Sequence, residues 1–191
     1  MDILGKLFGS ANKVKVMRLF LLNPEGSYST KEIAERSKMS PAAAARELKN
    51  LVAVDLVAKK IRGRAILWQL NPTFPFTNPL KLILKNDVLA RKKDLVKQFA
   101  TCGRVLVLLV SGVFLEQEDS RVDVLIAGDN LRRKAVERII KSLEAEIGKE
   151  LVYVVLDTPD FVYRRNASDK FLRDVLDFPH ELLVDKVGLS G

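Results

Sequence analysis

Hydrophobic residues in the first quarter of the chain recur with a helical period, and short polar segments interrupt them. Apolar side chains follow this period over residues 13–22, and the segment 23–26 supplies the proline and glycine that end such a pattern. Ser29 precedes Glu32 by three positions, the spacing at which a serine and a glutamate cap a helix start reciprocally. The pattern predicts a first helix over residues 13–22 and a short second helix that begins at Ser29 or Thr30.

A third helix and a β-hairpin follow in the same region. Ser40 is a favourable N-cap and Pro41 suits the first helical position, so the pair predicts a helix that runs to residue 51. Strand-like patterns at residues 56–61 and 65–70 flank a glycine that lies between two arginines. The chain up to residue 70 is therefore expected to form helix, short helix, tight turn, helix and a strongly basic hairpin.

A proline-rich segment in the middle of the chain indicates a domain boundary. Residues 71–79 hold three of the seven prolines, which predicts an extended connection and a domain boundary. We therefore expect one domain over residues 1–78 and a second over residues 79–191. A helical pattern over residues 80–100, bent near Asn86, is expected to open the second domain.

Apolar runs of strand length alternate with helical patterns in the second half of the chain. The longest helical pattern here covers residues 131–147 and ends at Gly148. A short helix is expected to be capped by Thr158 with Pro159, and another is expected to begin at Ser168. The expected strands span residues 105–110, 122–126 and 151–156. Strands separated by helices predict an α+β or α/β architecture with a small mixed sheet for this half.

Composition restricts the class of protein. Of the 191 residues, 48% are hydrophobic and 29% are charged, as expected for a globular protein. A single cysteine, Cys102, excludes a disulfide within the chain, and a lone histidine, His180, excludes a His-rich metal cage. No apolar run reaches the length of a membrane span, and the N-terminus lacks a signal-peptide pattern. We expect a cytoplasmic protein that does not act at a membrane, with structural roles for Cys102 and His180.

Charge divides the chain into two parts. Residues 1–104 carry 20 basic and 8 acidic side chains, a net charge of +12, whereas residues 105–191 carry 12 basic and 16 acidic side chains, a net charge of −4. A basic part joined to a mildly acidic part favours a polyanionic partner for the first part. A basic surface that serves only solubility is the alternative.

The order of elements expected over residues 11–70 resembles the winged helix-turn-helix domain of bacterial and archaeal transcription regulators, particularly the arsenic-repressor-like families. The resemblance implies that the third helix enters the major groove of double-stranded DNA and that the basic hairpin contacts the backbone or the minor groove. Arg46 and Asn50 lie one helical turn apart, and these residue types bind guanine and adenine, although both also suit phosphate. The residues expected to contact DNA are Ser40, Ala42, Ala43, Arg46, Lys49, Asn50, Lys59, Lys60, Arg62 and Arg64.

A second resemblance lies in the segments 109–112 and 119–126, which look like the signature of the polymerase-beta-like nucleotidyltransferase superfamily. Active members use alternating aspartates on one strand to bind magnesium. Arg121 stands where the resemblance requires the first of these aspartates, and the order of Ser111 and Gly112 is reversed. The resemblance therefore implies a degenerate site without metal, cofactor or catalysis. Its residues are Ser111, Gly112, Ser120, Arg121 and Asp123.

Taken together, these patterns predict a DNA-binding transcription regulator that acts as a homodimer, because DNA half-sites are usually matched by a two-fold protein. The second domain is expected to serve in dimerisation or in sensing a ligand that the sequence does not identify. Two alternatives stay open. One is a nucleotidyltransferase recruited to nucleic acid by its winged helix, and the other is a protein-interaction adaptor that resembles an antitoxin.

Overall fold

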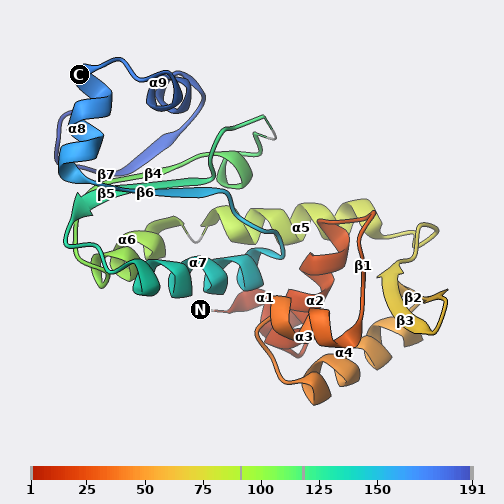
Figure 1. Cartoon of the computed structure of the whole chain (residues 1–191). Coiled ribbons are helices and arrows are strands. Elements are labelled where there is room, and N and C mark those ends of the chain that lie inside the picture. Colours follow the sequence, from red (N-terminus) through yellow and green to blue (C-terminus); the bar gives the residue numbers. More distant parts are fainter. Residues whose placement is uncertain (1, 91, 118, 190–191) are drawn as a thin grey trace. The chain divides into compact units, whose positions relative to one another are not determined.

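The structure is a mixed α+β fold with two separate β-sheets. The computed structural model describes residues 2–90, 92–117 and 119–189 (Figure 1). Helices and strands alternate along these ranges, in agreement with the coarse class expected from the sequence. Among the residues that the structure describes, no helix combines the length and the apolar character that a membrane crossing requires.

The chain divides into two compact units. Unit 1 consists of Met1–Val88 and Ser142–Glu150, and unit 2 consists of Leu89–Lys141 and Leu151–Gly191. This division differs from the boundary expected after residue 78. The helix that follows residue 78 carries the fully buried Leu84 into the hydrophobic core of unit 1 and therefore belongs mainly to that unit.

Unit 1 combines helices with a three-stranded antiparallel sheet in the order β1-β3-β2. Its core gathers apolar residues from every helix around the fully buried Phe20 and Ile33. The elements are α1 (Ile3–Leu7), α2 (Ala11–Leu21), β1 (Ser27–Tyr28), α3 (Thr30–Arg36), α4 (Pro41–Ala53), β2 (Val57–Arg62), β3 (Ala65–Leu70) and α5 (Thr77–Ala90).

Serine side chains cap three of these helices. The hydroxyls of Ser10 and Ser40 each accept a hydrogen bond from the backbone amide three residues further on, and Pro41 occupies the first turn of α4. Ser29 and Glu32 form the reciprocal capping box that their spacing predicts. The hydroxyl and the backbone amide of Ser29 donate to the Glu32 carboxylate and hold its pKa below the usual range. The predicted starts of α3 and α4 are confirmed.

Unit 2 contains a four-stranded mixed sheet in the order β6-β5-β4-β7, in which only β5 and β6 are parallel. Figure 1 shows α8 and α9 on one face of this sheet and α6 and α7 on the other. The elements are α6 (Lys92–Ala100), β4 (Arg104–Val110), the 3-10 helix η1 (Gly112–Phe114), β5 (Val124–Asp129), α7 (Arg133–Ile147), β6 (Tyr153–Asp157), α8 (Thr158–Asn166), α9 (Lys170–Asp177) and β7 (Glu181–Asp185).

The end of α7 and the loop after it pack on α2 within unit 1. Arg18 is only 1% exposed, and its Nη1 donates to the backbone oxygen of Glu146 at 2.7 Å. Asn23 Nδ2 donates to the backbone oxygen of Gly148 at 2.6 Å. Gly148 has a φ of +80°, and a Cβ at this position would lie 2.7 Å from Arg18 Cβ. Glycine therefore ends the helix, as expected, and also permits the close approach to α2.

Several local features differ from the sequence expectation, among them strand β1, which was not expected. The helix expected to bend near Asn86 continues through this residue as part of α5, and position 91, which follows α5 and precedes α6, lies outside the described residues. Strand β7 was not expected, because it is short and its apolar residues are only half-buried where it pairs with β4. Asp157, and not Thr158, caps α8 by accepting from the amide of Asp160 at 3.1 Å.

Candidate nucleic-acid interface

Helix α4 exposes one polar face and buries the other. Its exposed residues include Ala42, Arg46, Lys49 and Asn50, as expected, and Ser40 is exposed at the N-cap. The expectation that Ala43 faces outward is wrong, since Ala43 is only 7% exposed. It lies one turn before the buried Glu47 and on the same side as Ala44 and Leu48, which join the core. The exposed face therefore begins at Ala42 and continues through the two cations and Asn50.

Glu47 lies on the buried side of α4 and forms hydrogen bonds there. Its carboxylate is buried, accepts from the Ser10 hydroxyl at 2.7 Å and accepts from Asn50 Nδ2 at 3.2 Å. Because a carboxylate only accepts, the Asn50 amide directs an N–H towards Glu47. This role was not predicted, although Glu47 is the only acidic residue of α4. With Glu47 buried, the exposed face of α4 carries positive charge and no negative charge.

The β2–β3 hairpin extends beyond the core of unit 1. Its base is held by the buried residues Val57 and Leu70 and by a 3.1 Å hydrogen bond from Trp68 Nε1 to Thr30 Oγ1. Every residue from position 59 to position 66 is exposed. Gly63 at the tip has a φ of +60°, a conformation that glycine adopts without strain.

The cations expected on this surface lack carboxylate partners. Within the described ranges, none of the six forms an ion pair, whereas lysines and arginines elsewhere in the chain, such as Lys15 and Arg36, pair with glutamates. No acidic residue occurs between positions 56 and 70. The surface therefore presents uncompensated positive charge. The six cations are Arg46, Lys49, Lys59, Lys60, Arg62 and Arg64.

The second expected constellation comes together at the end of β4, but its polar atoms bind one another and the backbone. Asp123 accepts from the amide of Val113 at 2.7 Å through Oδ1 and from the amide of Val152 at 2.8 Å through Oδ2. Gly112 has a φ of +52°, and any Cβ there would collide with Asp123 Oδ1. Asp123 thus joins the loop after β4 to the start of β6. Each of its carboxylate oxygens therefore accepts one backbone N–H group.

The serines of this constellation are also occupied. Ser111 Oγ, which is buried, donates to the backbone oxygen of Pro179 at 2.6 Å, and Ser120 Oγ lies 2.9 Å from Ser111 Oγ and 2.7 Å from the backbone oxygen of Val122. Arg121 points elsewhere and pairs with Asp174 of α9 at 3.2 Å.

Acidic side chains do not gather around Asp123 as a metal site requires. Within the described ranges, no three His, Cys, Asp or Glu side chains are placed to hold a metal ion. Among the described contacts, Arg121 pairs with Asp174 and not with Asp123.

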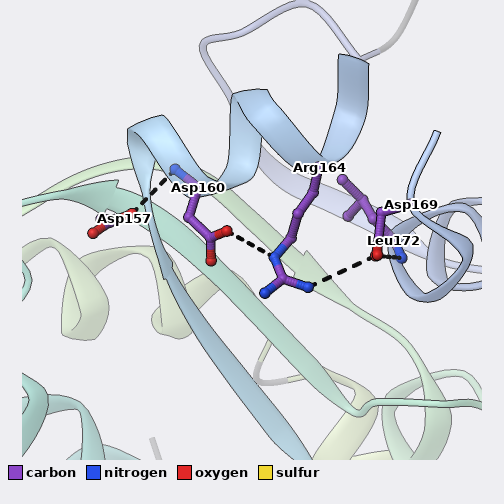
Figure 2. A network of polar contacts seen from close by, with 5 residues as sticks. All are labelled: Asp157, Asp160, Arg164, Asp169 and Leu172. Atoms are coloured by element: carbon purple, nitrogen blue, oxygen red, sulfur yellow. Dashed lines mark hydrogen bonds and ion pairs between the residues drawn. The ribbon is translucent and has the colours of Figure 1, made fainter. Parts of the chain in front are cut away.

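Three other side chains of unit 2, those of Arg164, Cys102 and His180, form local contacts or are buried. Figure 2 shows Arg164 between two carboxylates: its Nε donates to Asp160 at 2.9 Å, and its Nη1 lies 3.8 Å from Asp169, which caps α9. Cys102 is fully buried, and burial raises the pKa of its thiol. His180 Nδ1 lies 2.8 Å from the backbone oxygen of Phe178. These contacts suit structural roles for all three side chains.

Comparison of the chain with protein-family models, with curated proteins and with solved structures gives no match. The two resemblances noted in the sequence therefore depend on the residues that carry them. The function of the chain is inferred below from its own residues and contacts.

Proposed function

We propose that the protein is a DNA-binding transcription regulator whose unit 1 acts as a winged helix. The observation that carries the proposal is the surface formed by the exposed face of α4 and the β2–β3 hairpin. This surface presents six cations without carboxylate partners in the described structure, and the one acid of α4, Glu47, is buried. Double-stranded DNA is the polyanion that fits this combination, because its major groove admits a helix and its phosphates bind a basic hairpin.

The two elements take different tasks in this proposal. Arg46 and Asn50, one turn apart on α4, contact base edges in the major groove, where arginine suits guanine and asparagine suits adenine. Asn50 keeps its carbonyl oxygen and one N–H for this purpose, since Glu47 uses only the other N–H. The hairpin cations bind phosphates and so supply affinity that does not depend on sequence.

Unit 2 serves as a non-catalytic module for dimerisation or ligand sensing in this proposal. Arg121 supports this role, because it stands where the resemblance requires the first magnesium-binding aspartate and a guanidinium repels a metal ion. A homodimer in the cytoplasm would present two copies of α4 to the two halves of a DNA site.

The test is a titration of a fluorescent duplex over a series of salt concentrations. Replacing Arg62 and Arg64 by alanine removes two proposed phosphate contacts. The negative slope of log affinity against log salt should then become less steep by about 1.8. Between 50 and 200 mM salt, this slope change alters the affinity ratio of wild type to variant about 12-fold.

The matched control replaces Arg133 and Lys134, two exposed cations of α7 in unit 2, and changes the net charge by the same amount. This control should leave the salt slope unchanged. Equal slopes for the hairpin variant and the wild type would remove the hairpin from the interface, and absence of wild-type binding at low salt would refute the proposal.

A further inference from the structure

Two isoleucines near the tip of the β2–β3 hairpin are exposed to an extent that folding does not explain. Ile61 is 70% exposed and Ile66 is 49% exposed. Their Cα atoms are register partners across the two strands, so the side chains lie next to each other on one face of the hairpin. We call Ile61 and Ile66 the hairpin isoleucines.

The hairpin isoleucines lie on the same face of the strands as the buried pair at the hairpin base, with the Lys59–Trp68 pair between them. Strand alternation places Val57 and Ile61 on one face of β2, and register pairs Val57 with Leu70 and Ile61 with Ile66 on the same face of β3. Val57 and Leu70 are buried in unit 1, whereas the hairpin isoleucines are not. This face of the hairpin therefore has a buried apolar pair at its base and an uncovered apolar pair near its tip.

Charge indicates which partner covers this surface. Four cations, three before Gly63 and one after it, lie beside the hairpin isoleucines within positions 59–64, and no acid lies between positions 56 and 70. A partner must therefore offer dense negative charge beside apolar surface. Duplex DNA carries about one negative charge per 1.7 Å of its axis, and deoxyribose carbons and base edges lie between its phosphates. Proteins that bind the minor groove often place apolar side chains against base steps there.

We propose, on the basis of the proposed function, that the hairpin isoleucines pack against the sugar and base-edge surface of DNA in the minor groove. The neighbouring cations bind the phosphates on either side. The two contributions differ in their response to salt, since phosphate contacts weaken as salt rises and apolar contacts do not release counterions. The hairpin isoleucines thus supply a part of the affinity that is independent of salt.

The experiment replaces both hairpin isoleucines by threonine in the full chain. Threonine keeps the β-branched shape that suits a strand but adds a hydroxyl that resists burial against DNA. The double variant should bind duplex DNA about tenfold more weakly or worse at every salt concentration, with an unchanged slope of log affinity against log salt. Val54→Thr is the matched control, because Val54 is also exposed in unit 1 but lies outside the hairpin.

The outcomes separate this inference from the proposed function. Wild-type protein that fails to bind DNA overturns the proposed function and this inference together. Wild-type binding with equal affinity in the double variant overturns this inference alone. A changed salt slope would also overturn it, because the substitutions would then act through the cations. Loss of binding to phosphatidylserine vesicles with DNA affinity unchanged would assign the hairpin isoleucines to a membrane surface instead.

Discussion

Replacing Asp123 by asparagine separates a structural carboxylate from a catalytic one. In the structure, both oxygens of Asp123 accept backbone N–H groups, at 2.7 Å from Val113 and at 2.8 Å from Val152. Asparagine retains one acceptor and turns an NH₂ group towards the other amide, so one favourable contact becomes a contact between two donors. The Val113 amide is partly buried, whereas the amide of the exposed Val152 can turn to water.

The expected loss follows from these two hydrogen bonds. Asp123→Asn should lower the free energy of unfolding by about 1–2 kcal/mol, and Asp123→Ala, which removes both acceptors, by about 2–4 kcal/mol. For a chain of this size, each kcal/mol corresponds to about 2–4 °C in melting temperature. Thermal unfolding of the full chain, followed by circular dichroism, measures the difference.

Whether the melting temperature falls or rises in Asp123→Asn distinguishes a structural carboxylate from a catalytic one. A carboxylate kept for metal or substrate is commonly a burden on stability, so its replacement leaves the melting temperature unchanged or raises it. An unchanged or raised melting temperature in Asp123→Asn would therefore refute the structural role. Asp119→Asn is the matched control, because Asp119 is exposed in the preceding loop and has no hydrogen bond among the described contacts of its side chain.

Three further predictions test other parts of the structure. Arg18→Met should lower the free energy of unfolding by about 3 kcal/mol, because the buried guanidinium holds the backbone of Glu146, and denaturant titration measures this loss. Gly112→Ala should destabilise unit 2 by more than about 1 kcal/mol in the same assay, since its φ is +52° and its Cβ would meet Asp123. Arg46→Ala should broaden the sequence preference recovered from a pool of random duplexes, whereas Arg62→Ala should weaken binding to all sequences equally.

Local signals in the sequence predicted much of unit 1. Ser29 with Glu32 and Ser40 with Pro41 define helix starts through contacts that span three residues, and such contacts can be read directly from spacing. The hairpin was equally clear, because Gly63 permits the positive φ that its turn requires.

Features that depend on distant contacts were beyond the sequence. Ala43 was expected to be exposed, but a small residue in an alanine run gives no signal of which face it occupies. The buried carboxylate of Glu47 depends on Ser10, 37 residues away. The packing of residues 142–150 on α2 depends on Arg18, which in sequence looks like one more surface cation.

The candidate sites show the same limit. Sequence alone grouped Ser111, Gly112, Ser120 and Asp123, and the structure brings them together. It did not reveal that Val113 and Val152 occupy both oxygens of Asp123, because backbone amides are present at every position and leave no mark in the pattern. The partner of Arg121, Asp174, lies 53 residues further along the chain and could not be chosen among many acids.

The most direct test of the proposed function is binding of the wild-type protein to DNA at near-physiological salt. Fluorescence anisotropy should compare genomic duplexes from around the protein's own gene with scrambled duplexes of equal length and composition. We predict selective binding to at least one genomic duplex that persists near physiological salt. Equal binding to scrambled DNA would contradict a sequence-specific regulator, and no binding even at low salt would contradict the assignment of α4 and the hairpin as a DNA-binding surface.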